Sequence, residues 1–322
     1  MPSHGLEIQQ IIDYVYEKYK DIEDGDVATY IPELAKANPK HFGICLATVD
    51  GQVFRAGDWD QEFTIQSMCK PFAFQMALEQ WGMQETLKRV GIEPSGDAFN
   101  SIELDPKTAR PYNPMINAGA IAISSMIKKA PIEAGIQSFV DKMSEAAGRK
   151  LQIDLAVMAS EKLTGDRNRA IAYLMRNFNV IDELVTESLE QYFAQCSLLA
   201  NCQDVALMAA TLANMGKHPS TGAPVFDFNY IKYVLSVMFT CGLYDYAGEW
   251  AYEVGLPAKS GVAGGIFGVV NRQLGLCVYS PRLDSRGNSV RGILACKELA
   301  SHLGLHAFEF TNVGSSFMQW LL

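Results

Sequence analysis

The 322-residue chain lacks features that would place it in several large classes of protein. It has no run of about 18 apolar residues, so we expect no transmembrane helix and no membrane partner. Its net charge of −9 provides no general basic face for phosphate groups, which argues against a nucleic-acid partner. His302 and His306 are four residues apart but do not form an H-E-x-x-H pattern, so we expect no metal site and no other cofactor.

The cysteine pattern and the first residues predict the compartment. The seven cysteines form no C-x-x-C pair, and several lie in apolar runs, which indicates buried free thiols in a reducing cytosol. Residues 1–7 lack the basic stretch and apolar run of a secretory signal. We therefore expect a cytoplasmic protein. The content of 48% hydrophobic and 20% charged residues is typical of a globular chain with a full core.

The two ends of the chain carry the strand signals. Asp50-Gly51 lies between two β-type runs, which predicts a hairpin. Two further apolar strands are expected near the C-terminus, and a helix is expected beside each pair of strands. The predicted strands are 42–48, 52–55, 265–270 and 274–280, and the predicted helices are 6–19 and 290–303.

The middle of the chain is rich in Ala, Met and Leu, and residues 117–145, 155–178 and 182–215 are expected to be mostly helical. One helix should begin after Asn201, a good N-cap residue, and stop at Gly216. We therefore predict an α/β (α+β) fold: an antiparallel sheet flanked by helices, with an inserted all-helical lobe and an active site at the lobe junction. The predicted α/β lobe comprises 1–66 and 225–322, and the predicted helical lobe is 67–224.

Ser67-Met68-Cys69-Lys70 is the strongest chemical signal in the chain, and Lys259-Ser260-Gly261 follows it. Ser-x-x-Lys with a later Lys-Ser/Thr-Gly is the order found in serine acyl-transfer enzymes of the penicillin-recognising type. On a helix, residues three apart share a face, so Lys70 can reach Ser67 as its base. A lysine serves as a base only if burial or another cation lowers its pKa, and Lys259 is a candidate for that cation.

Other polar residues lie where a helical core does not need them, and each allows a purely structural interpretation. Asn117 could be the N-cap of the helix that follows it. Glu161 and Asn168 could belong to an exposed charged loop around Gly165. Tyr192 and Tyr244 could be core aromatics with surface hydroxyls.

Taken together, these segments resemble the serine-dependent glutaminases, which hydrolyse L-glutamine to L-glutamate and ammonia. The resemblance runs from Tyr30 to Gly292 and is closest to the compact bacterial enzymes. The matching blocks are QSMCKP at 66–71, EPSG at 93–96, NPMINAGAI at 113–121, SE at 160–161 with GDRN at 165–168, YF at 192–193, MAATLAN at 208–214, CGLYD at 241–245 and GLPAKSGVAGGI at 255–266.

The resemblance implies a β-lactamase-like fold, a homo-oligomer (dimer or tetramer), and a role for each matching residue. Ser67 would be the nucleophile, Lys70 its base, and the N–H groups of Ser67 and Val262 the oxyanion hole. Either Tyr192 or Tyr244 would protonate the departing ammonia, and the sequence does not choose between them. The implied substrate pocket also includes Tyr30 at its mouth, Asn117, Glu161 and Asn168.

Two other functions are compatible with Ser-x-x-Lys. A penicillin-recognising acyl-transferase or β-lactamase-like hydrolase would share both motifs, but the chain has no Ser-Asp-Asn element between them and no export signal. A non-catalytic module would use Ser67 only as an exposed residue of a capped helix.

Overall fold

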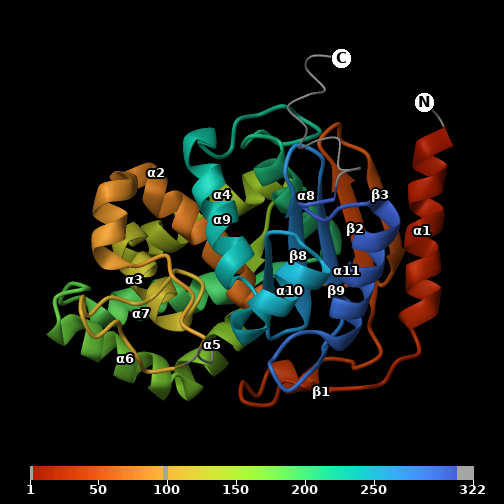
Figure 1. Cartoon of the computed structure of the whole chain (residues 1–322). Helices are drawn as coiled ribbons and strands as arrows, with labels where there is room; N and C mark the ends of the chain where they lie inside the picture. Colours follow the sequence, from red (N-terminus) through yellow and green to blue (C-terminus); the bar gives the residue numbers. More distant parts are fainter. Residues whose placement is uncertain (1–2, 97–100, 310–322) are drawn as a thin grey trace.

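A five-stranded antiparallel sheet, ordered β3-β2-β9-β8-β7, forms one side of the molecule in the computed structural model, which describes residues 3–96 and 101–309 (Figure 1). The predicted hairpin and the predicted C-terminal strand pair are both confirmed, and β2 pairs with β9, so that both chain ends enter one sheet. The strands are β2 Gly43–Thr48, β3 Val53–Gly57, β7 Ala258–Gly261, β8 Gly265–Val270 and β9 Leu274–Tyr279.

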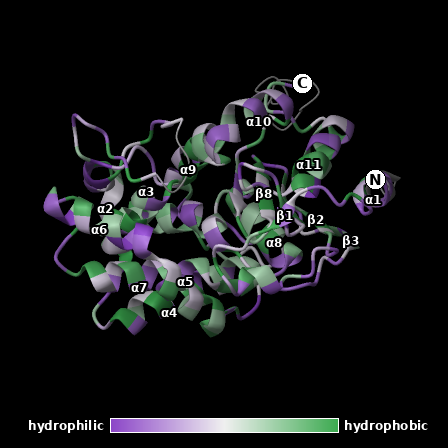
Figure 2. Ribbon diagram, turned by 90° about the horizontal axis from the view of Figure 1, so that it is seen from below, coloured by the Kyte–Doolittle hydropathy of each residue, from purple (hydrophilic) through white to green (hydrophobic). Residues whose placement is uncertain are grey.

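Helices cover both faces of this sheet. Side chains alternate along a strand, so Ile44 and Leu46 pack with α1 (Ser3–Tyr19) and α11 (Val290–Leu303). Cys45 belongs to the larger core on the opposite face, where α8 (Cys202–Ala213) covers the sheet. A Cβ at Gly275 would lie 2.3 Å from the Ala210 nitrogen, so this close packing of α8 requires glycine. Figure 2 shows hydrophobic residues gathered on the sheet and α8.

The other side of the molecule is mainly helical (Figure 1). A small second sheet is ordered β4-β6-β5, with β6 paired antiparallel to both of its neighbours. The helices are α2 Lys70–Arg89, α3 Asn117–Ile127, α4 Ile132–Ala147, α5 Leu155–Thr164, α6 Asp166–Asn177, α7 Val185–Cys196 and α9 Phe228–Cys241, and the short strands are β4 Phe63–Thr64, β5 Gln152–Ile153 and β6 Leu198–Ala200.

Residues 182–215 are mostly helical as predicted, but the short strand β6 separates α7 from α8 within this run. Pairing of β6 with strands on both sides outweighs the helical propensity of its residues. Asn201 caps α8 as predicted, in a capping box with Asp204. The helix ends at Ala213, with Asn214 as its C-cap, rather than at Gly216. The lobe boundaries at residues 66 and 225 stay a prediction.

Several shorter elements complete the described fold. These are β1 Asp26–Val27 paired with β10 Arg282–Leu283, the 3₁₀ helices η1 Leu34–Lys36, η2 Gln66–Cys69 and η3 Tyr244–Tyr246, and α10 Ala247–Glu253. Within the described ranges no helix combines the length and the apolar character needed to cross a membrane. All seven cysteines are buried free thiols, as predicted.

Candidate active site

Ser67 and Lys70 lie at the start of α2, where a 3₁₀ helix (η2) passes into the α-helix. Residues three apart eclipse one another in a 3₁₀ helix, so the spacing brings both side chains to one face even more directly than an α-helix would. Ser67 is only 6% exposed and Lys70 only 1%. The interpretation of Ser67 as an exposed cap residue is therefore wrong. Gln66, just before the serine, has a φ of 50°, a strained conformation often found at functional sites.

Strand β7 packs directly against η2. A Cβ at Gly261 would lie 2.7 Å from the carbonyl oxygen of Ile65, so glycine permits the close approach of the two segments. This contact brings Val262, the residue after β7, to the same cavity as Ser67. The Lys-Ser-Gly motif thus has a structural role in joining the edge of the sheet to the serine.

A cavity of about 240 Å³ opens beside Ser67, where β7 meets the helices. Its volume lies below the range of about 300–1,000 Å³ typical of drug-sized ligands, so it suits a molecule as small as an amino acid. Seven of the ten predicted site residues line it: Tyr30, Ser67, Asn117, Glu161, Asn168, Tyr192 and Val262. Lys70, Tyr244 and Lys259 are buried around it.

Lys70, Asn117 and Asn168 form a hydrogen-bonded chain across the site. The Lys70 Nζ donates to Asn117 Oδ1 at 2.7 Å, and Asn117 Nδ2 donates to Asn168 Oδ1 at 3.0 Å. The N-cap of α3 is Ile116, so the alternative assignment of Asn117 as N-cap is wrong. Its side chain instead connects the Ser-x-x-Lys motif to α6.

Glu161 faces the cavity from α5, and Asn168 faces it from α6. Two helices that meet at Gly165 replace the exposed loop that the sequence also allowed. Glu161 is 7% exposed, and burial raises its pKa to about 7, although Gln66 and the charge on Lys70 partly oppose this. Burial disfavours the ionised form of Glu161, and a cation that enters the cavity stabilises that form.

The two motif lysines are both buried. Burial lowers the pKa of Lys70 to about 8, within reach of a neutral base. Lys259 has a pKa well below its ordinary value, first because it is buried and second because Lys70 repels it. Burial rather than a second cation therefore accounts for most of the change at Lys70. The Lys259 Nζ donates to the Ser260 carbonyl at 2.9 Å and lies 4.0 Å from the centre of the Tyr244 ring.

Tyr244 is held in position beside Ser67. Its φ is 57°, its hydroxyl donates to the Ser260 carbonyl at 3.3 Å, and its side chain is 8% exposed. Burial raises its pKa to about 12, an effect that the nearby Ser67 hydroxyl partly offsets. Tyr192 is also buried, and burial raises the pKa of its phenol well above its usual value. The surface-hydroxyl interpretation fails for both tyrosines.

Sequence reasoning missed six residues of the cavity wall. Gln66 directly precedes the motif serine, and its position in Gln-Ser-x-x-Lys was the only signal that could have identified it. Its Nε2 donates to Thr64 Oγ1 at 3.1 Å, and it also interacts with Glu161. The others are Ile31, Thr164, Gly165, Arg167 and Cys196. Among the described residues no group of three or more His, Cys, Asp or Glu side chains could hold a metal ion.

Comparisons with known proteins agree on one family. The glutaminase family model matches residues 25–308. A glutaminase of Trichormus variabilis is 54% identical over 303 residues, which cover 94% of this chain and 91% of the relative. The solved structure of a probable glutaminase, ybaS, has a TM-score of 0.92 at 37% identity, covering 94% of this chain and 99% of that one.

A second solved structure, a probable glutaminase from Bacillus subtilis complexed with 6-diazo-5-oxo-L-norleucine, has a TM-score of 0.84 at 34% identity. The matched region covers 95% of this chain and 97% of the Bacillus subtilis chain. Together with the antiparallel sheet and its flanking helices, these likenesses confirm the predicted β-lactamase-like fold class.

Proposed function

Because the chain belongs to the glutaminase family and hydrolyses L-glutamine to L-glutamate and ammonia, we propose that the reaction passes through a glutamyl ester on Ser67. The observation that carries the proposal is the burial of Ser67 at the wall of an amino-acid-sized cavity, beside Tyr244 and in the same motif as Lys70. The similarity to glutaminases favours this substrate over β-lactams, the alternative considered from the sequence.

The cavity walls suit the two charged groups of an α-amino acid. Glu161 faces the α-ammonium group, where a charge-assisted hydrogen bond is stronger than a neutral one. Asn117 and Asn168 donate to the α-carboxylate with the help of the Tyr192 hydroxyl. Tyr30, which is 54% exposed, stands at the mouth. The γ-amide then reaches Ser67.

The reaction is a two-step acyl transfer. Neutral Lys70 accepts the Ser67 proton as the oxygen attacks the γ-carbonyl, and the N–H groups of Ser67 and Val262 stabilise the oxyanion. Tyr244, whose raised pKa keeps it protonated, donates to the departing nitrogen, and Lys259 positions its ring. Water then attacks the ester and releases glutamate.

A mechanism-based label tests the nucleophile. 6-Diazo-5-oxo-L-norleucine is a glutamine-like diazoketone that alkylates nucleophiles and releases N₂. We expect one adduct on the peptide that contains Ser67, visible by mass spectrometry, and no adduct in Ser67→Ala. A label on another residue in the wild-type protein would assign the nucleophile elsewhere.

The pH dependence tests Lys70 and Glu161 together. In the free enzyme Lys70 must be neutral and Glu161 ionised, so kcat/KM should rise steeply up to pH about 7, less steeply to about 8, and then level off. Bound ammonium lowers the pKa of Glu161, so kcat should show only the limb near pH 8. Steady-state rates across this range check both profiles, and a flat kcat profile would remove Lys70 as the base.

We also propose that the enzyme acts in the cytoplasm as a homo-oligomer, a dimer or a tetramer. Seven buried free thiols support a reducing compartment. The oligomer rests on the family resemblance. Light scattering coupled to gel filtration measures the state directly, and a monomer at micromolar concentration would contradict it.

A further inference from the structure

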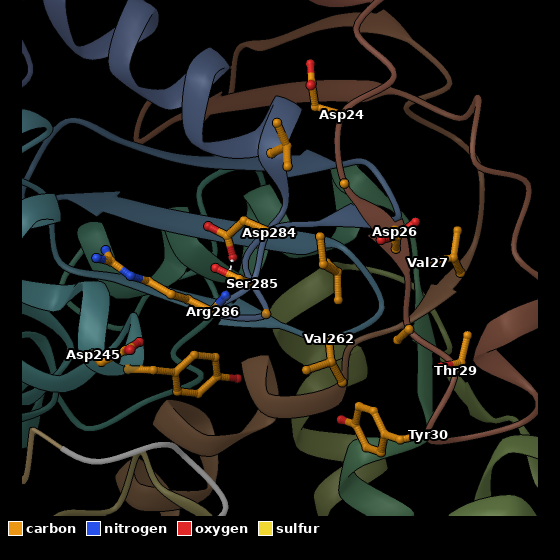
Figure 3. A pocket seen from close by; sticks show the side chains of 16 residues that line it. Asp24, Asp26, Val27, Thr29, Tyr30, Asp245, Val262, Asp284, Ser285 and Arg286 are labelled. Carbon is orange, nitrogen blue, oxygen red and sulfur yellow. Dashed lines mark hydrogen bonds between the residues drawn. The ribbon is translucent and has the colours of Figure 1, made fainter.

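A second and larger cavity, of about 820 Å³, lies next to the catalytic cavity (Figure 3). Tyr30 and Val262 line both cavities, so the two spaces meet at the mouth of the site. Ammonia has a single non-hydrogen atom, and its release alone does not need a space of this size. The larger cavity is called the acidic chamber below, for the carboxylates in its wall.

In the proposed mechanism the acidic chamber lies on the leaving-group side of Ser67. Tyr244 lines the chamber and is absent from the described wall of the catalytic cavity. In the mechanism proposed above, this tyrosine donates its proton to the departing nitrogen. Glu161 and Asn168 hold the opposite end of the substrate and line only the smaller cavity. A substituent on the amide nitrogen would therefore extend into the chamber.

The chamber wall carries more acidic than basic side chains. Asp24 and Asp26 come from the segment around β1, Asp284 follows β10, and Asp245 lies in η3 (Figure 3). Among the described lining residues the only Lys or Arg is Arg286. Its guanidinium donates to Glu249 at 2.9 Å and lies 5.2 Å from the centre of the Tyr246 ring. Its charge is thus paired, and the wall is negative overall.

We propose that the acidic chamber binds primary amines that carry a second positive charge, and that these amines take the glutamyl group from Ser67 in place of water. The inference rests on the glutamyl ester proposed above. The neutral amine nitrogen attacks the ester carbonyl, a C–N bond forms, and the C–O bond to Ser67 breaks. The amine gives its proton to the Tyr244 oxygen, which lost one to ammonia in the first step, and Lys70 returns to the Ser67 oxygen the proton that it took there. The products are a γ-glutamyl amide and the free enzyme.

Competition between amines of equal reach tests the selection. The enzyme would be incubated with L-glutamine and 1,4-diaminobutane, butylamine or 4-aminobutanoate at mildly alkaline pH. Mass spectrometry would measure the γ-glutamyl amide, and glutamate release would measure hydrolysis in the same tube. Corrected for the fraction of neutral amine, the ratio of transfer to hydrolysis should be about tenfold higher for the diamine than for butylamine, as expected for one or two partly screened charge pairs. It should be lowest for 4-aminobutanoate.

The double variant Asp24→Asn with Asp26→Asn should remove most of the diamine advantage and leave hydrolysis of glutamine within about twofold of wild type. Asp60→Asn is the matched control, an exposed aspartate outside the chamber wall. Normal hydrolysis with no transfer to any amine, or equal transfer to all three, would overturn the proposal. If the reaction does not pass through a Ser67 ester, the diazoketone label will be absent as well, which distinguishes that result from a failure of amine transfer alone.

Discussion

Ser67→Ala is expected to lower kcat for glutamine hydrolysis by at least about 10⁴-fold, because removal of a catalytic nucleophile leaves only binding and oxyanion stabilisation. The alanine cannot form the ester, and no other activated nucleophile takes the place of the serine hydroxyl. Ammonia release from L-glutamine, with L-asparagine and D-glutamine in parallel, measures the loss and the substrate preference together.

The same variant should fold normally. Ser67 is buried, but its hydroxyl is small, so its loss should change the free energy of unfolding by no more than about 1 kcal/mol. Ser236→Ala is a suitable control, since among the described residues that hydroxyl bonds within its own helix, to the Lys232 carbonyl at 2.7 Å. Thermal unfolding checks all three proteins. Near wild-type turnover in a well-folded Ser67→Ala would place the nucleophile on another residue.

Glu161→Gln is expected to raise KM for L-glutamine by roughly 10–100-fold while kcat changes by only a few-fold. The amide keeps the shape of the side chain but removes the charge that faces the α-ammonium, and hydrogen bonds to charged groups contribute about 1.5–3 kcal/mol. Steady-state kinetics separates the two parameters. The variant should also lose the limb of the kcat/KM profile near pH 7 that we assign to Glu161.

Glu190→Gln makes the same chemical change outside the cavity. Glu190 lies on α7 in an ion pair with Lys162, where partial exposure makes the pair weak. The KM of the Glu190→Gln enzyme for L-glutamine should stay within about twofold of wild type. A Glu161→Gln enzyme with unchanged KM and a large loss in kcat would move Glu161 from substrate binding into the chemical step.

The sequence by itself determined the local features of this enzyme. The three-residue spacing of Ser67 and Lys70 fixes a common face in any helical backbone, Asp50-Gly51 specifies a hairpin, and Asn201 with Asp204 specifies a helix start. Each depends on residues within about one turn of one another. The motif blocks added the family and therefore the reaction.

Tertiary structure decided what depends on contacts between distant segments. Lys70 and Asn117 are 47 residues apart in the sequence. The packing of α3 against α2 brings the Lys70 Nζ to within 2.7 Å of Asn117 Oδ1. Burial of Lys70 and Glu161 sets pKa values that no local spacing encodes. The strand β6 exists because two partners flank it. Likewise, the acidic chamber forms only where β1, β10 and η3 meet, because its carboxylates come from both ends of the chain.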